Sequence, residues 1–223
     1  MPILHNQTYN KLKSNIHGLL FLPSFDQSNL NNYDGTLSGK PCASSEFSVC
    51  NQTVLKDILL NNDINTIVEI GVYRHEPSAH FTFGTPHCPS TVVILEYKKR
   101  ECKYLGIDLD NKDFLKSPEN NIFTIQENSA HVNNINQYML ELDITTIDLL
   151  IIDGYHSVNM AFNDWIYTER LSENGIVLIH DTNRHPGPML LFDAIDPEVY
   201  DKEKSCTEYD DNGIAIIRKR NEN

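Results

Sequence analysis

Long hydrophobic runs are missing from this chain of 223 residues. The apolar segment GLLFL at residues 18–22 is too short for a membrane span or for the core of a signal peptide. Basic charge is also scarce, since 18 Lys and Arg stand against 31 Asp and Glu and the net charge is −13. We therefore expect no membrane partner, and no nucleic acid bound through the surface as a whole.

Closely spaced cysteine pairs are missing as well. The five cysteines are scattered along the chain, odd in number and without a C-x-x-C motif. This pattern favours free thiols in a reducing compartment over a disulfide framework. Together with the absence of a signal-peptide pattern, it predicts an intracellular, cytoplasmic protein.

What the chain does contain is typical of a globular protein of one ordinary domain. Hydrophobic residues make up 40% of it and charged residues 22%. Residues 1–52 are rich in Asn, Ser, Gly and Pro clusters and predict an N-terminal extension or lid. Residues 53–223 have regular periodicity and predict a single domain.

Strand-length apolar runs alternate with helical patterns in that second part. We expect helices at 53–62, 90–100, 131–142, 156–171 and 188–195, strands at 65–70, 103–110, 121–125, 147–152 and 175–180, and a hairpin within 206–219. The run at 90–100 suits either element, and its position between two strands favours a helix. Thr53 and Ser90 are the predicted N-caps, and Trp165 is expected in the core. The alternation predicts an α/β fold: a Rossmann-like three-layer sandwich whose mostly parallel, seven-stranded sheet ends in a C-terminal antiparallel hairpin.

Two of the predicted strands end in a carboxylate. IDLLIIDGYHS stops at Asp153 and continues into a turn with His156, and GIVLIHDTN stops at Asp181 with Asn183 two residues on. Parallel strands place their carboxyl ends at one edge of the sheet, where ligands bind in open α/β folds. We expect these side chains to meet in one crevice.

The ordered set of motifs resembles a known family. VEIGV, LGIDLD, IDLLIIDGYHS and ENGIVLIHDTN are similar to the class I S-adenosylmethionine-dependent methyltransferases, in particular the small-molecule O-methyltransferase branch with IDG-x-H and HD signatures. The resemblance covers about residues 53–220 and implies a cofactor site at the ends of the first four strands. Its implied cofactor-binding residues are Glu69, Gly71, Tyr73, Asp108, Ser129, Ala130 and Asp153.

The resemblance also assigns parts to these residues. Glu69 would face the ammonium of the methionine moiety, Gly71 would let the backbone approach it, and Asp108 would accept the ribose hydroxyls. A family-typical second glycine is absent, and about residues 74–90 form an insertion instead. Within it His80, His87 and Cys88 fit no standard zinc spacing, which favours solvated loop residues over a metal site.

Methyl transfer to oxygen needs an anionic acceptor, which a base or a divalent cation can supply. By the resemblance, His156 is a candidate base; it is also placed to cap the following helix. Asp153, Asp181 and Asn183 (or Thr182) offer oxygen ligands for Mg²⁺. Asp181 can instead orient His156 or His180 without any metal.

The expected activity is methyl transfer from S-adenosylmethionine to a hydroxyl of a small molecule, such as a sugar or polar metabolite. One alternative is a degenerate Rossmann-like binding or interaction domain without activity. Another is a metal-dependent histidine–aspartate phosphohydrolase, which His180-Asp181 suggests but whose family is all-helical. Edge elements of such domains often pair, so a homodimer is an open expectation.

Overall fold

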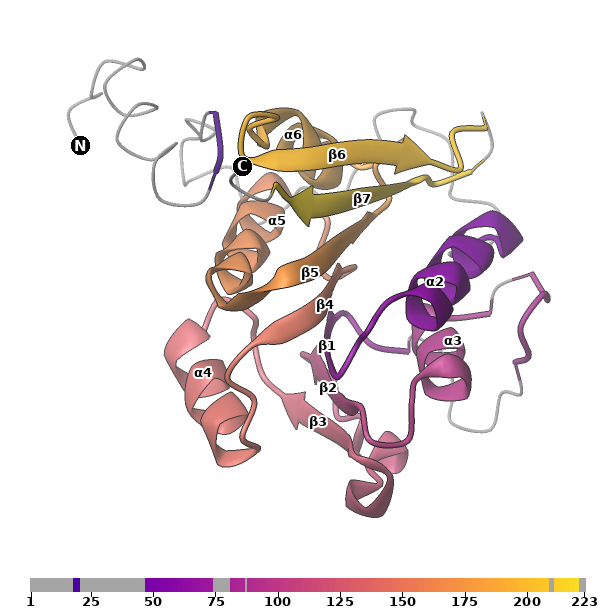
Figure 1. Ribbon diagram of the computed structural model, residues 1–223, viewed down its shortest axis with the longest axis vertical. Coiled ribbons are helices and arrows are strands. Elements are labelled where there is room, and N and C mark those ends of the chain that lie inside the picture. Colours follow the sequence, from indigo (N-terminus) through magenta and orange to yellow (C-terminus); the bar gives the residue numbers. More distant parts are fainter. Residues whose placement is uncertain (1–17, 21–46, 74–80, 87, 209–210, 221–223) are drawn as a thin grey trace.

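The structure is a computed structural model that describes residues 18–20, 47–73, 81–86, 88–208 and 211–220 (Figure 1). Its α-helices are α2 (Val49–Asn61), α3 (Ser90–Tyr97), α4 (Val132–Glu141), α5 (Val158–Asp164) and α6 (Pro186–Ala194). Its 3-10 helices are η2 (Asp113–Leu115), η3 (Pro118–Asn120) and η4 (Trp165–Arg170). Its strands are β1 (Thr66–Ile70), β2 (Lys103–Asp108), β3 (Ile122–Gln126), β4 (Ile147–Ile152), β5 (Leu171–His180), β6 (Tyr200–Ser205) and β7 (Ile214–Lys219).

The strands form one seven-stranded sheet with the order β3-β2-β1-β4-β5-β7-β6. The pairs from β3 to β5 are all parallel, whereas β7 runs antiparallel to both β5 and β6. The predicted mostly parallel sheet with a C-terminal antiparallel pair is therefore confirmed.

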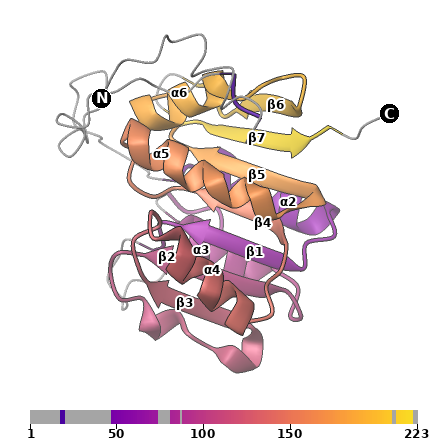
Figure 2. The same cartoon turned by 90° about the vertical axis from the view of Figure 1, so that its left-hand side faces the viewer.

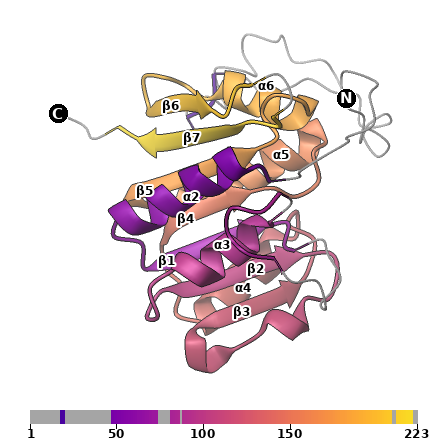
Figure 3. The ribbon, with the colours of Figure 1, turned by 90° about the vertical axis from the view of Figure 1, so that its right-hand side faces the viewer.

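Helices cover both faces of the sheet. Figure 2 shows α4, α5 and α6 in front of one face, and Figure 3 shows α2 and α3 in front of the other. Side chains alternate along each strand, so Val68 and Ile70 pack with the α4–α6 layer while Ile67 packs with α2 and α3. Because both faces are buried there, the central parallel strands contain continuous apolar runs, such as LLII in β4 and IVLI in β5. Trp165 is completely buried, as predicted.

The first described helix begins earlier than its pattern suggested. Ser48, in extended conformation, caps α2, and its hydroxyl accepts the N–H of Asn51 at 3.1 Å. The predicted cap at Thr53 is wrong, since this hydroxyl lies inside the helix and donates to the carbonyl of Val49. The predicted apolar face is confirmed, with Leu55 and Ile58 buried.

The predicted cap of α3 is wrong for a different reason. Pro89 takes the N-cap position and Ser90 is already helical. The Ser90 hydroxyl is drawn to a buried carboxylate on β1, that of Glu69. A tertiary contact has therefore taken the group that the local pattern assigned to capping.

The C-terminal half departs from the predicted boundaries at three points. The helix expected over 156–171 divides into α5 and η4, and β5 begins at Leu171. The helix expected at 188 starts at Pro186. The outer strand of the predicted hairpin is β6, residues 200–205, so the connection to β7 is longer than the Asp-Asn-Gly turn alone.

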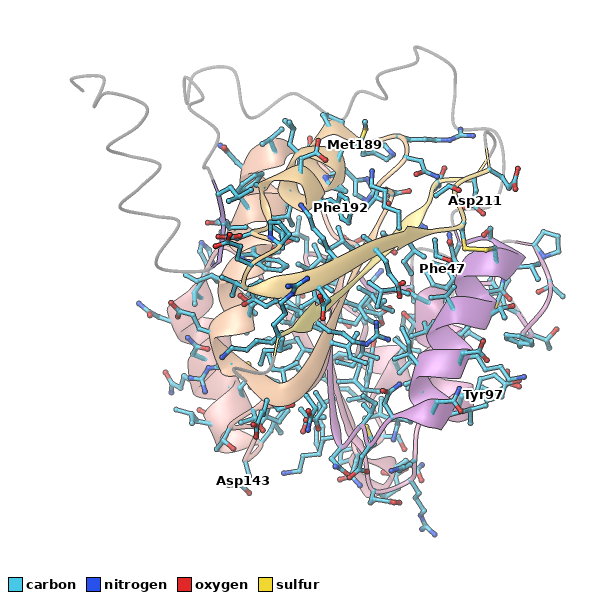
Figure 4. All side chains as sticks on the ribbon, turned by 45° about the horizontal axis from the view of Figure 1, so that its top comes forward. Phe47, Tyr97, Asp143, Met189, Phe192 and Asp211 are labelled. Carbon is cyan, nitrogen blue, oxygen red and sulfur yellow. A yellow bond between two sulfur atoms is a disulfide. The ribbon has the colours of Figure 1, made fainter. Side chains whose placement is uncertain are left out.

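The free-thiol prediction fails for two of the cysteines. Cys50 in α2 and Cys206 after β6 form a disulfide across 156 residues of sequence, drawn as the yellow bond in Figure 4. Cys88 and Cys102 are free and buried. Scattered spacing was a poor guide because the fold brings the start of α2 beside the end of β6.

Most of the expected N-terminal lid lies outside the described residues, whereas residues 81–86 and 88–90 of the insertion are described. Leu19 is buried and forms a bridge with Ile195 after α6, and Phe81 and Phe83 of the insertion pack against the α2–α3 core. His80 and His87 lie outside the described ranges. None of the helices in the described part of the chain has the length and apolarity needed to span a membrane.

Candidate functional site

The predicted site residues gather at the carboxyl edge of the parallel strands. Ile70 of β1 pairs in register with Ile107 of β2 and Ile152 of β4. Gly71, Asp108 and Asp153 therefore follow at the same level on three neighbouring strands. His180 ends β5, the next strand along, and Asp181 follows it directly. This edge is the ligand-binding position of open α/β sheets.

Gly71 allows the ends of β1 and β4 to approach each other closely. Its φ is +86°, and a Cβ there would lie 2.0 Å from the carbonyl oxygen of Asp153. A side chain cannot be accommodated against backbone at that distance, whatever the conformation. The missing side chain of Gly71 thus lets the end of β4 lie against β1, and it also leaves the backbone of the loop after β1 without a side chain at this position.

Asp108 lies against the loop that follows Gly71. Its Oδ2 accepts the N–H of Val72 at 2.7 Å, and its Oδ1 accepts the N–H of Asp110 at 2.8 Å. Tyr73 continues this loop with a positive φ of 34°, and its carbonyl accepts a hydrogen bond from Lys112. The structure therefore brings Gly71, Tyr73 and Asp108 together.

Glu69 is placed differently from the expectation. Its side chain is fully buried on the α3 face, where it accepts hydrogen bonds from the hydroxyls of Ser90, Thr91 and Tyr104. Burial raises the pKa of the Glu69 carboxyl to about 7, against the lowering effect of the three hydroxyls. In this structure the carboxylate holds the start of α3 through Ser90 and Thr91. Thr91 in turn accepts the N–H of Tyr73, which links α3 to the loop after β1.

Ser129 and Ala130 form the loop after β3. The hydroxyl of Tyr167 donates to the carbonyl of the buried Ser129 at 2.6 Å, and Ala130 donates its N–H to the side-chain oxygen of Asn128. Beside Ser129 lies Asp164 of α5, whose carboxyl burial raises its pKa to about 7. The sequence pattern around α5 did not indicate that this acid is buried.

Two carboxylates and three imidazoles converge where β4 and β5 end. His156 Nε2 lies 2.7 Å from Asp181 Oδ2 and 3.5 Å from Asp153 Oδ1. His180 Nδ1 lies 2.9 Å from Asp153 Oδ1 and 3.5 Å from Asp181 Oδ2. The ring of His185 stacks on that of His156, with centroids 4.3 Å apart. The predicted meeting of Asp153, His156 and Asp181 is thus present in the structure.

The charges in this cluster support one another. Burial alone would lower the pKa of His156, but the carboxylates of Asp181 and Asp153 outweigh it and raise that pKa to about 9. The same carboxylates raise the pKa of His180 against its burial. In return, the imidazoles hold the pKa of Asp181 well below its usual range although burial opposes this. The cluster is a tightly coupled set of ion pairs.

Asp181 occupies its place at a conformational cost. Its φ of +62° is in the left-handed region, which non-glycine residues rarely adopt. Its side chain is buried, and Oδ1 has no hydrogen-bond partner among the described residues. Strain and an unsatisfied oxygen at one residue are features of functional sites rather than of packing.

Asn183 is not brought into the cluster. Its side-chain amide donates to the carbonyls of Cys206 and Asp211, and so faces the loop before β7. Thr182 is completely buried, with no hydrogen-bond partner for its hydroxyl in the described part of the chain. The structure thus separates Asn183 from the two carboxylates with which it was expected to act.

Asn51 was not among the predicted site residues. It is completely buried on α2, and its Nδ2 lies 3.1 Å from His180 Nε2. No sequence pattern marked it, because the helix was expected to begin at Thr53, after Asn51. Its contact partner, 129 residues away, could not be read from the sequence.

The cofactor and the metal fit these residues unequally. Asp108 offers a carboxylate that can accept hydrogen bonds from ribose hydroxyls, and the glycine beside it at position 71 leaves room for a ligand to approach the backbone. Mg²⁺ prefers an octahedron of oxygen ligands. Here the two carboxylates are surrounded by imidazoles and the expected amide ligand faces elsewhere. The residues present do not fit Mg²⁺.

A family model described as a methyltransferase domain matches residues 81–182. This range holds Asp108, Ser129, Asp153, His156 and Asp181. No curated protein sequence matches the chain. The fold is Rossmann-like, and solved structures of methyltransferases share it.

Three solved structures illustrate the likeness. An O-methyltransferase from Bacillus cereus in complex with SAH has a TM-score of 0.55 at 12% identity, over 97% of this chain and 100% of that one. The MycE methyltransferase of the mycinamycin pathway, in complex with Mg, SAH and mycinamycin VI, has 0.51 at 13%, over 75% and 48%. A TDP-rhamnose 3′-O-methyltransferase of calicheamicin biosynthesis has 0.51 at 11%, over 76% and 78%. The chain spans about half the length of the MycE protein that it matches.

Proposed function

We propose that this protein is an S-adenosylmethionine-dependent methyltransferase that methylates a hydroxyl of a small molecule, with His156 as the general base. The observation that carries the proposal is the position of His156 Nε2, 2.7 Å from Asp181, on the same sheet edge as the Gly71 loop and Asp108. The methyltransferase-domain match and the SAH-bound structural neighbours support the cofactor.

The cofactor half of the site would be formed by β1 and β2. The bare backbone at Gly71 and the carboxylate of Asp108 would position the methionine and ribose parts of S-adenosylmethionine. The loop with Ser129 and Ala130 would border the adenine. Tyr73 is largely buried in the Gly71 loop and would fix the course of that loop.

The acceptor half would be the histidine–aspartate cluster. Methyl transfer is an in-line displacement in which an oxygen anion attacks a cationic donor, so the acceptor hydroxyl must lose its proton. His156 would take that proton on its other ring nitrogen, because Nε2 is ion-paired with Asp181. The negative charge of Asp153 and Asp181 favours its protonated state. His156 can therefore act as a base only when positive charge, such as that of the sulfonium, compensates these carboxylates.

The acceptor is proposed to be a sugar or another polar metabolite. This rests on the O-methyltransferases of small molecules among the structural neighbours, one of them acting on TDP-rhamnose. Tyr155 is exposed next to His156, and His185 stacks on the His156 ring, so both are placed to border an acceptor. The assistance by Mg²⁺ that the sequence suggested is not part of this proposal, because the ligand set does not suit that ion.

Calorimetry with SAH and turnover assays on hydroxylated small molecules test the proposal together. His156→Gln should leave SAH affinity unchanged and lower turnover by about 10²–10⁴-fold, the usual contribution of a general base. The exposed His131, paired with Glu127, is the matched control, and His131→Gln should change neither quantity. Failure of the wild-type protein to bind SAH at millimolar concentration would refute the proposal.

The alternative is a degenerate binding domain without activity. It predicts that SAH binding persists while no acceptor is methylated and His156→Gln has no effect on any measured property. The phosphohydrolase alternative is wrong, because its family is all-helical and His180-Asp181 here end a strand of a seven-stranded sheet.

A further inference from the structure

The cluster at the ends of β4 and β5 has the spacing of a metal site but not the ligands of a magnesium site. Four donor atoms form a closed ring in which nitrogen and oxygen alternate. Around it, His156 Nε2 to Asp181 Oδ2 is 2.7 Å, Asp181 Oδ2 to His180 Nδ1 is 3.5 Å, His180 Nδ1 to Asp153 Oδ1 is 2.9 Å, and Asp153 Oδ1 to His156 Nε2 is 3.5 Å.

These separations are close to those of donors shared by one ion. Imidazole and carboxylate ligands bind zinc-like dications at about 2.1 Å, which places neighbouring ligands roughly 3.0–3.4 Å apart at tetrahedral or square angles. Two ring edges, 2.7 and 2.9 Å, are hydrogen-bond distances just below this range, and the other two, both 3.5 Å, lie just above it, so small side-chain shifts bring the atoms to ligand spacing. Asp181 also keeps a buried oxygen, Oδ1, without a hydrogen-bond partner among the described residues, although the side chain is only 4% exposed.

The nature of the donors argues for a particular class of ion. Mg²⁺ is a hard ion that takes oxygen ligands in a near-ideal octahedron. Imidazole suits zinc, iron, nickel and copper ions instead. His180 is buried among the carboxylates, whereas Asn183, the oxygen ligand expected for Mg²⁺, is held by the carbonyls of Cys206 and Asp211.

We propose that Asp153, His180 and Asp181 bind a first-row transition-metal dication such as Zn²⁺, in preference to Mg²⁺, with His156 facing the same point from the side of the acceptor. This inference rests on the proposed function for the purpose of the site, and it departs from the magnesium found with the MycE neighbour. His156, the fourth member of the ring, is then not a ligand: its Nε2 is ion-paired with the ligand Asp181, and it remains the base.

Asn51 would orient the metal-binding imidazole. A histidine that binds a metal through one ring nitrogen donates its other N–H to an acceptor. Asn51 Nδ2 lies 3.1 Å from His180 Nε2, and Asn51 Oδ1 is a buried acceptor without a partner among the described residues. Because the oxygen and nitrogen of an amide are interchangeable by a flip, Oδ1 can accept the Nε2–H when Nδ1 of His180 holds the ion.

Cobalt binding tests the proposal without any enzymatic assay. Metal-free full-length protein is titrated with Co²⁺ and followed by its visible absorption, and then Zn²⁺ or Mg²⁺ is added in competition. We expect one equivalent of Co²⁺, displaced by Zn²⁺ but not by a thousand-fold excess of Mg²⁺, in keeping with an imidazole ligand. Proton NMR of the cobalt form should show a strongly shifted, exchangeable imidazole N–H, a readout that needs no variant.

Variants then identify the ligand. His180→Ala should lower Co²⁺ affinity by at least about 100-fold, while Asn51→Leu should lower it by about 10-fold and Asn51→Asp, which keeps an acceptor oxygen, should restore it. The exposed His131→Ala is the matched control and should bind as the wild type does. Circular dichroism confirms that each variant is folded.

Three outcomes would overturn the proposal: no stoichiometric Co²⁺, displacement of Co²⁺ by Mg²⁺, or an imidazole N–H signal unshifted in the cobalt form. SAH calorimetry on the same metal-free protein distinguishes failure of the metal proposal from failure of the proposed function. Binding of SAH without cobalt binding removes only the metal proposal. Binding of cobalt without SAH removes only the methyltransferase proposal.

Discussion

At the scale of single residues, two carboxyl groups of this protein are buried away from water. Glu69 is fully buried and receives three hydroxyl hydrogen bonds, and Asp164 is buried beside Ser129. Each is a carboxyl group whose pKa burial raises to about 7. A raised carboxyl pKa makes folding depend on pH, because the folded protein holds a proton that the unfolded chain has released.

Glu69→Gln should flatten the pH dependence of stability. Between the ordinary Glu pKa of 4.5 and the folded value of about 7, folded wild-type protein binds this proton and the unfolded chain does not. The contribution of Glu69 to the free energy of unfolding is therefore greatest below pH 4.5, falls through this window by at most about 3 kcal/mol, and stays low above it. Urea unfolding at about pH 5 and about pH 8 measures the difference.

The exposed Glu198→Gln is the control for this comparison and should keep the wild-type pH dependence. If the free energy of unfolding of Glu69→Gln changed with pH as much as that of the wild type, the prediction would be contradicted, because the buried carboxyl would then stay ionised between pH 4.5 and about 7. Glu69 was predicted as a site residue from its motif alone. The motif could not predict that its side chain points inward, because strand alternation gives the face on which a side chain lies and not its neighbours there.

At the scale of elements, α2 is tied to the far edge of the sheet. The Cys50–Cys206 disulfide joins its first turn to the end of β6, and the adjacent Asn51 contacts His180 at the end of β5. Cys206 also accepts a hydrogen bond from Asn183, two residues after Asp181. The disulfide is therefore the covalent part of a contact between α2 and the loops that hold the cluster.

Replacing both Cys50 and Cys206 by Ala should lower the free energy of unfolding by about 2–5 kcal/mol. The physical reason is that a cross-link over a long loop restricts the unfolded chain, by an amount that grows with loop length. The loop here covers 156 residues. Denaturant unfolding of oxidised wild type, wild type with a dithiol reductant, and the double variant makes the measurement.

In this comparison the reductant should destabilise the wild type and leave the double variant unchanged. Identical unfolding midpoints for oxidised and reduced wild type would contradict the prediction. So would mass spectrometry that finds both thiols alkylatable in the native protein.

At the scale of the whole molecule, the strand order brings two groups of site residues to the same edge of the sheet. The order β2-β1-β4-β5 sets the Gly71 loop and Asp108 beside the histidine–aspartate cluster. A bound cofactor would touch the ends of several strands, so its binding energy should stabilise the entire sheet. Ligands that bind only the folded state raise the unfolding temperature by mass action.

SAH at about 100 times its dissociation constant should therefore raise the unfolding temperature by about 5–10 °C. Such saturation adds about 2.7 kcal/mol, and a chain of this size gains about 2–4 °C per kcal/mol. Scanning calorimetry gives the shift directly. Asp108→Ala should lose most of it, and the neighbouring Asp110→Ala, whose side chain is largely exposed, should keep it. Equal shifts for both variants would argue against the ribose role of Asp108.

The sequence by itself determined the layered α/β fold and the edge of the sheet where the acids lie. Both follow from local periods of apolar residues and from strands that stop at Asp108, Asp153 and Asp181. Only the tertiary structure decided which side chains meet. It paired Cys50 with Cys206, set Asn51 on His180 and turned Asn183 away from the cluster. These outcomes depend on side-chain directions and on distances between residues far apart in the chain, and no local pattern encodes either.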